Sequence, residues 1–155
     1  MNRRLALLGA ALLVVGCGGQ TAKPTAPVLE FQGAPALTIA STSGRLTIGV
    51  WWSPVQPTVG YAATQLAITD ATGAPVIGLA LTIVPWMPAY GHGASVEPTV
   101  SETAPGVYVA TPLDFFMAGE WELRTAIARA TDGGVSDAGN VEMIDDSAQP
   151  TVEVP

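Results

Sequence analysis

The chain has very little cysteine, histidine or positive charge. Its 155 residues include one Cys, one His and six Lys or Arg against 13 Asp or Glu, for a formal net charge of −7. A lone cysteine excludes an internal disulfide framework and any CxxC metal site. The acidic balance makes the chain a poor partner for phosphate backbones, so we expect no nucleic-acid binding. Its 48% of hydrophobic residues, 17 Gly and 13 Pro are instead typical of a single turn-rich globular domain.

No hydrophobic run is long enough to span a bilayer, which takes about 20 residues. The uncharged run from Leu5 to Val15 has 11 residues and follows the basic pair Arg3-Arg4, as in a secretory signal. It ends at Val14-Val15-Gly16-Cys17, which resembles the bacterial lipoprotein box. The resemblance implies that residues 1–16 are a signal peptide and that Cys17 is acylated and becomes the first mature residue. The alternative is an ordinary signal peptide with an incidental cysteine.

The residues after the cysteine bear on where the protein is held. Gly18, rather than Asp, follows Cys17, which in Gram-negative lipoproteins resembles sorting to the outer membrane, on its periplasmic face. Loss of residues 1–16 leaves 139 residues with 13 acids and four bases, a net charge of −9. Anionic headgroups repel such a chain, so we expect the lipid, and not surface charge, to hold it at the membrane. Residues 17–36, rich in Gly, Pro, Thr and Ala, are expected to form a flexible tether.

Period-two patterns are typical of residues 37–146. Alternate residues of Leu46–Trp52 are apolar, and Trp121, Leu123 and Ile127 share a face. No mature segment shows a helical stripe with caps. The sequence therefore predicts an all-β protein, an immunoglobulin-like antiparallel β-sandwich of six to seven strands.

Three further expectations concern this sandwich. Asp70-Ala71-Thr72-Gly73 is typical of a turn, and Trp121 with either Trp51 or Trp52 is expected to fill the core. Asn140 to Ile144 is expected to return as a last strand. Residues 147–155 are expected to form a disordered acidic tail.

The strongest local signal lies in two segments of the expected domain. They are Pro85-Trp86-Met87-Pro88-Ala89-Tyr90-Gly91-His92-Gly93 and Phe115-Phe116-Met117-Ala118-Gly119-Glu120-Trp121-Glu122-Leu123, with Gly106-Val107-Tyr108 between them. In this order they resemble the YtkA-like family, related to FixH-like proteins, over roughly residues 45–130. The resemblance implies an exported or membrane-anchored immunoglobulin-like β-sandwich, and some relatives are linked to copper handling and cytochrome oxidase maturation. Tyr90 stands where the family often has a second Met beside the His.

Thioether and imidazole groups favour Cu(I) in an oxidising compartment. Met87 and His92 lie on a loop bracketed by Pro and Gly, and Met117 precedes a strand that is expected to start at the same end of the sandwich. We therefore regard Met87, His92 and Met117 as a candidate copper(I) site, which Trp86 or Tyr90 would shield. The alternative is structural: Met87 fills a gap in the core, and His92 donates to a backbone carbonyl at a turn.

Other chemistries find less support in the sequence. One histidine without cysteine ligands builds neither a blue-copper centre nor, readily, a tetrahedral structural zinc site. The chain has no nucleophile elbow and no glycine-rich phosphate loop, so we expect no enzymatic activity and no catalytic residues. The sequence predicts a binding or accessory module anchored by its N-terminal lipid, with an envelope protein or a copper-trafficking protein as partner. The alternative is a structural or protein-interaction lipoprotein that binds no metal.

Overall fold

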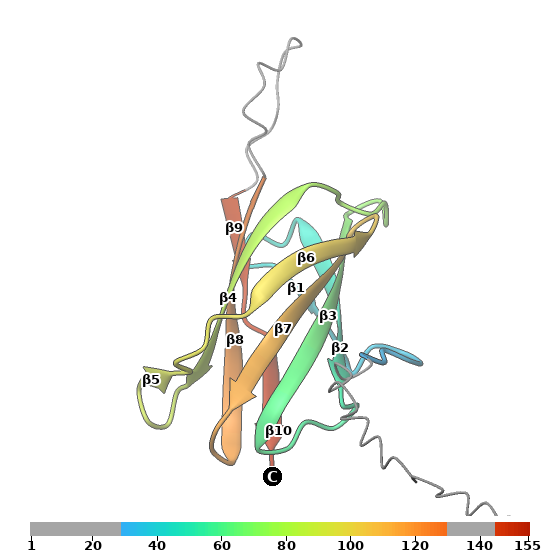
Figure 1. The fold of residues 1–155 in the computed structure, drawn as a ribbon. Coiled ribbons are helices and arrows are strands. Elements are labelled where there is room, and N and C mark those ends of the chain that lie inside the picture. The colour runs from blue at the N-terminus through green and yellow to red at the C-terminus, as the bar shows by residue number, and fades with distance from the viewer. Residues whose placement is uncertain (1–28, 130–144) are drawn as a thin grey trace, which may run out of the picture.

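The computed structural model describes residues 29–129 and 145–155, which form ten β-strands and no helix (Figure 1). None of the described residues therefore belongs to a helix that could cross a membrane. The strands in chain order are β1 (Leu37–Ala40), β2 (Leu46–Ser53), β3 (Gly60–Asp70), β4 (Leu79–Met87), β5 (His92–Gly93), β6 (Thr99–Ala104), β7 (Val107–Phe115), β8 (Gly119–Arg129), β9 (Asp145–Ala148) and β10 (Thr151–Val154).

The strands form two stacked antiparallel sheets (Figure 1). The first sheet has the order β1-β2-β3-β7-β6. The second has the order β10-β8-β4-β5, and β9 also pairs with β8. The predicted all-β sandwich is confirmed, with ten strands in place of six or seven. The surplus comes from strands of two to four residues, which are too short to give a period-two signal of their own.

The core lies between the sheets and follows the predicted alternation. In β2, the side chains of Leu46, Ile48, Val50 and Trp52 are buried, and in β8 those of Trp121, Leu123 and Ile127 are buried. Trp52 is thus the second core tryptophan, and Trp51 lies on the opposite face of β2. The Trp51 indole covers Gly49, where an added Cβ would meet the ring at 3.0 Å. Glycine at this position lets the ring lie flat against the strand.

The predicted turn after β3 is confirmed. The Asp70 carboxylate accepts hydrogen bonds from the Thr72 amide at 2.8 Å, the Thr72 hydroxyl at 2.7 Å and the Ala74 amide at 3.0 Å. Gly73 has φ +84, a left-handed conformation in which glycine avoids the strain of a Cβ. An acidic residue at the start and glycine near the end therefore fix this turn.

The expected disordered tail at residues 147–155 is wrong. β9 pairs with the second half of β8 and β10 with its first half, through Thr125↔Ala148 and Thr151↔Glu122 among other pairs. The 11-residue β8 has an edge opposite β4 that these two short strands cover. Ala148 and Val154 enter the core there. The domain thus extends past residue 146, and the expected last strand at Asn140 to Ile144 lies outside the described residues.

The described part of the expected tether is held on the domain. The Glu30 amide donates to the Ser53 hydroxyl at 3.2 Å, and the Ala36 amide donates to the Val50 carbonyl at 2.7 Å. Between them, the Trp51 indole NH donates to the Gly33 carbonyl at 3.0 Å. Residues 29–36 therefore follow the outer face and end of β2. The signal peptide, Cys17 and the rest of the expected tether lie outside the described residues.

Candidate functional site

The predicted site residues lie at one end of the sandwich. At this end β2, β4 and β7 finish and β3 and β8 start, as the pairs Gly60↔Phe115 and Trp86↔Glu122 show. Segments 54–59, 88–91 and 116–118 connect these strands, and we call the surface they form the histidine end. The Asp70 turn and the connection to β4 lie at the opposite end.

A tight hairpin places Met87 beside His92. The two residues are directly opposite each other in the β4–β5 pair, so their side chains project to the same side of the sheet. The amides of Tyr90 and Gly91 both donate to the Met87 carbonyl, at 3.2 and 3.0 Å, which closes the turn. Gly91 has φ +67, which a residue with a Cβ adopts only with strain. The backbone thus places Met87 and His92 opposite each other, and the convergence of their side chains on one ion stays a prediction.

Met87 is a core residue. Its side chain is fully buried within the apolar cluster between the sheets. A Cβ added at Gly119 would lie 3.1 Å from the Met87 methyl carbon, so glycine at the start of β8 leaves room for this side chain. Met87 therefore packs in the core, as the structural alternative expects.

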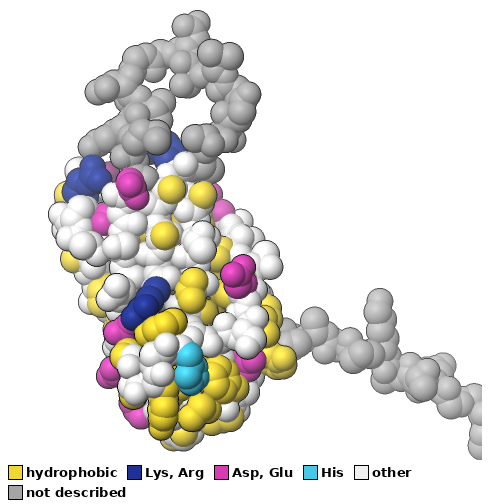
Figure 2. Space-filling view, turned by 90° about the vertical axis from the view of Figure 1, so that its left-hand side faces the viewer, with side chains coloured by type: hydrophobic (Ala, Val, Ile, Leu, Met, Phe, Trp, Pro, Cys, Tyr) yellow, Lys and Arg dark blue, Asp and Glu magenta, His cyan; other side chains and the backbone are white. Residues whose placement is uncertain are grey.

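The His92 ring lies among aromatic side chains. It stacks on Phe116 with ring centroids 5.4 Å apart and planes at 21°, and the Tyr90 ring centroid is 6.0 Å away. Figure 2 shows hydrophobic side chains beside and below the histidine at this end of the molecule. The ring has no hydrogen bond to any described residue, and no described polar side-chain atom is buried without a partner. Neither ring nitrogen is therefore fully buried, and His92 does not donate to a described turn carbonyl.

Met117 is joined to His92 through its neighbour in sequence. Phe116, which stacks on His92, also packs edge-on against the buried Trp121, with centroids 5.2 Å apart. The Trp121 indole NH donates to the Met117 carbonyl at 3.0 Å, which fixes the start of β8. The Met117 side chain is half-buried against the core. The structure thus brings all three predicted donors to one end of the sandwich.

The two residues predicted to shield the site, Tyr90 and Trp86, lie in different places relative to His92. Tyr90 is 59% exposed and lies beside the His92 ring. Trp86 precedes Met87 in β4, so its side chain is on the outer face, where the Arg124 guanidinium lies 4.2 Å above its ring centroid. Phe116, rather than Trp86, lies against the His92 ring. Alternation offers a signal for it, because Phe115 and Phe116 point to opposite faces and only one of them can be in the core.

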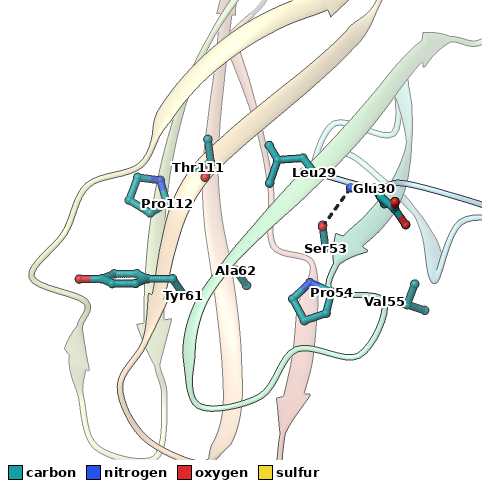
Figure 3. Close-up of a pocket in the computed structure, with 9 residues that line it drawn as sticks. All are labelled: Leu29, Glu30, Ser53, Pro54, Val55, Tyr61, Ala62, Thr111 and Pro112. Carbon is teal, nitrogen blue, oxygen red and sulfur yellow. Dashed lines mark hydrogen bonds between the residues drawn. The ribbon is translucent and has the colours of Figure 1, made fainter. Parts of the chain in front are cut away.

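A second feature of this end is an open groove of about 680 Å³ (Figure 3). Its walls come from the segment before β1, the end of β2, the start of β3 and the middle of β7. The lining is mostly apolar, and Tyr61 projects from it with 72% of its surface exposed. The lining residues are Leu29, Glu30, Ser53, Pro54, Val55, Tyr61, Ala62, Thr111 and Pro112.

Comparison with known proteins gives one match. A family model described as YtkA-like matches residues 45–126, which is more than half of the chain. The matched range runs from the start of β2 into β8 and includes Met87, His92 and Met117. No curated protein and no solved structure is significantly similar to the chain.

Proposed function

The chain belongs to the YtkA-like family, and from this premise we propose that it is a lipid-anchored, non-catalytic binding module of a bacterial cell envelope that carries Cu(I) at its histidine end. In this proposal Cys17 bears the lipid. His92, Met117 and Met87 supply the donors. Cu(I) is the cargo of the module rather than part of a catalytic centre.

One observation carries the copper proposal. His92 presents two ring nitrogens without a described protein partner, on a ring that Phe116 holds in place, directly opposite a methionine. A neutral imidazole with thioethers is a donor set that suits Cu(I) better than harder divalent ions. Among the described residues, no three His, Cys, Asp or Glu side chains gather closely enough to hold a metal ion. The proposal therefore depends on the two methionine sulfurs.

The three donors differ in how an incoming ion reaches them. His92 and Met117 are half-buried and open to the surface, whereas Met87 is fully buried. Coordination by Met87 requires the turn at residues 88–91 to move outward. We therefore expect initial capture by His92 and Met117, followed by Met87. Tyr90, on this turn, then covers or uncovers the ion.

Cu(I) titration of the purified chain against a competing chelator tests the donor set. We expect the wild-type protein to retain one Cu(I), and His92→Ala and Met117→Leu each to weaken retention by at least about tenfold. Met117→Leu keeps the side-chain size and removes only the sulfur. Tyr90→Phe, which keeps the ring beside His92, is the matched control and should retain copper. Equal retention by the wild type, His92→Ala and Met117→Leu would remove the site.

A second function, protein interaction without metal, is favoured by the packing of Met87. A fully buried methionine stabilises the fold whether or not it ever binds an ion. In that case His92→Ala lowers the melting temperature by loss of the Phe116 contact, and Cu(I) leaves the melting temperature of the wild type unchanged. A ligand that binds the native state raises apparent stability, so a rise in melting temperature with Cu(I) decides for the first function.

The anchor has a separate test. We expect the mature chain, expressed in a Gram-negative host, to begin at an acylated Cys17 and to fractionate with the outer membrane. Mass spectrometry of the N-terminal peptide reads the modification directly. Cys17→Ser should abolish acylation and release the protein into the soluble envelope fraction. An unmodified Cys17 in a membrane-bound chain would contradict the anchor.

A further inference from the structure

Large exposed hydrophobic side chains gather at one end of the molecule. The described residues include seven such side chains, and only Ile77 lies at the end of the sandwich that carries the Asp70 turn. The other six lie at the histidine end or on the groove beside it: Leu29, Val55, Val59, Tyr61, Tyr90 and Phe116. Val55 and Tyr61 are the most exposed, at 71% and 72%. A patch of this kind on one end marks an interaction surface.

The segments that connect the strands at the histidine end carry no charged side chains. Segments 54–59, 88–91 and 116–118 contain 13 residues, and none is Asp, Glu, Lys or Arg. Val55, Val59, Tyr90 and Phe116 are the exposed large hydrophobic residues of these segments. Pro57 is buried and Met117 half-buried, and Glu120 and Glu153 follow on the outer face of the second sheet. Uncharged loops with tyrosine and phenylalanine fit the interface between lipid headgroups and acyl chains.

The path of the N-terminal segment indicates what the histidine end contacts. The first described residue, Leu29, lines the groove, and the Glu30 amide is bonded to Ser53 at the end of β2. Only 11 residues separate Leu29 from Cys17. Such a segment spans at most about 40 Å, so a lipid on Cys17 keeps this end within reach of the bilayer. A tethered surface meets the membrane at high effective concentration, which makes a weak contact sufficient.

We propose that the histidine end and the adjoining groove dock onto the lipid bilayer, with Val55, Val59, Tyr61, Tyr90 and Phe116 at the headgroup level. The proposal rests on the lipid anchor proposed above. It places the His92 nitrogens next to the membrane surface and the Asp70 turn away from it. Because the mature chain has a net charge of −9, docking is stronger on zwitterionic lipid than on anionic lipid.

Depth-dependent fluorescence quenching tests the docking independently of acylation. Cys17 and the residues before it are replaced by a hexahistidine tag, and the chain is tethered to phosphatidylcholine vesicles through a nickel-chelating lipid. With Cys17 absent, Val55→Cys, Tyr90→Cys or Ile77→Cys each gives one labelling site. We expect spin-labelled lipids to quench probes at positions 55 and 90 several-fold more than a probe at 77. Equal quenching at all three positions would overturn the proposal.

Ile77 is a suitable control because it is 57% exposed and follows Pro75 and Val76, which pair with Thr69 and Ile68 near the opposite end of β3, roughly 20–25 Å along the strand from Tyr61. The double variant Val55→Ser/Val59→Ser should lower the quenching at position 90 toward the level at position 77, while Ile77→Ser leaves it unchanged. Replacing part of the phosphatidylcholine by phosphatidylglycerol should weaken the quenching, and salt should restore it.

Two other outcomes have distinct meanings. If the probes at 55 and 90 are already shielded without vesicles and the chain sediments as a dimer, the patch joins two copies and lipid docking is wrong. If docking is found but Cys17 in the native protein carries no lipid, the anchor proposal fails and the docking surface stands. The nickel tether and the N-terminal peptide mass therefore separate the two proposals.

Discussion

Asp146 joins two segments that are more than 100 positions apart in the chain. Its carboxylate accepts hydrogen bonds from the amide and the hydroxyl of Ser43 and from the amide of Ser147. Burial acts to raise the pKa of Asp146, but hydrogen bonds from Ser41, Ser43 and Ser147 outweigh it and lower the pKa from 3.8 to about 2. The ionised carboxylate thus holds β9 to the turn between β1 and β2.

This pKa sets a pH dependence of stability. Because the folded-state pKa is below the unfolded value, the contribution is complete above about pH 4 and is lost as pH falls toward 2. We expect Asp146→Asn to lower the free energy of unfolding at pH 7 by about 2 kcal/mol, and the deficit to shrink in this acidic range. Urea unfolding followed by tryptophan fluorescence measures it. Asp145→Asn, at the exposed neighbour, is the control, and an equal deficit there would contradict the assignment.

Tyr108 is the polar group that joins the two sheets at the end opposite His92. Its hydroxyl donates to the Val76 carbonyl at 2.8 Å and accepts from the Leu79 amide at 3.1 Å. The side chain is 1% exposed, so loss of the hydroxyl leaves a buried amide without its acceptor. We expect Tyr108→Phe to cost about 2 kcal/mol of stability in thermal or urea unfolding. Tyr61→Phe, on an exposed ring, should change stability by less than about 0.5 kcal/mol, and similar costs for both variants would refute this role.

At the scale of elements, the turn between β6 and β7 is under tighter constraint than the turn after β3. Gly106 has φ +71, and a Cβ there would lie 2.7 Å from the Pro75 Cβ and 3.0 Å from the Ile68 carbonyl oxygen. Its amide donates to Glu102 at 2.9 Å. The hydrogen bonds from the Gly106 and Gly78 amides hold the pKa of Glu102 below its usual range. Backbone conformation and packing therefore both require glycine at position 106, whereas its amide hydrogen bond excludes only proline.

Two alanine substitutions separate strain from packing. Gly73→Ala meets only the strain of a positive φ, because nothing lies within 4 Å of its Cβ, and should cost about 1 kcal/mol. Gly106→Ala adds a clash with backbone and with Pro75, and should cost about 3 kcal/mol or more. Equilibrium unfolding of the two variants measures the difference. Equal costs would show that the β6–β7 turn relaxes around the new methyl group.

The long strands could be predicted from sequence and the short ones could not. β2, β3 and β8 carry one apolar face each, so a period of two is visible in the residues themselves. β9 reads Asp-Asp-Ser-Ala, with no apolar alternation, and is stabilised by pairing with β8 and by the Asp146 hydrogen bonds. Such stabilisation comes from residues distant in sequence, which a local pattern does not contain.

The arrangement of the candidate site could likewise be predicted only in part from sequence. The approach of Met87 to His92 follows from a Pro and Gly turn at the end of a strand, and this was predictable. The stacking of His92 on Phe116 depends on how β7 crosses the hairpin of the other sheet, and only the fold shows it. For the same reason, the outward direction of Trp86 depends on the register of β4, which places Met87 inside.

At the scale of the whole molecule, polarity is unequally distributed between the two ends. The histidine end has uncharged loops and, together with the groove beside it, six large exposed hydrophobic side chains, and the chain enters the domain beside it. The opposite end is fixed by polar ties, including Asp70 on its turn and Glu102 with Gly78. In the docking proposed above, this arrangement turns the proposed copper site toward the membrane.

In the proposed function, His92, Met87 and Met117 together bind one Cu(I). Nuclear magnetic resonance of the isotope-labelled chain during anaerobic Cu(I) addition tests it most directly. We expect the His92 ring nitrogens and the methyl groups of Met87 and Met117 to shift together and to reach saturation at one equivalent. If these signals stay fixed through one equivalent of Cu(I), or change only together with unfolding, the histidine end is not a copper site.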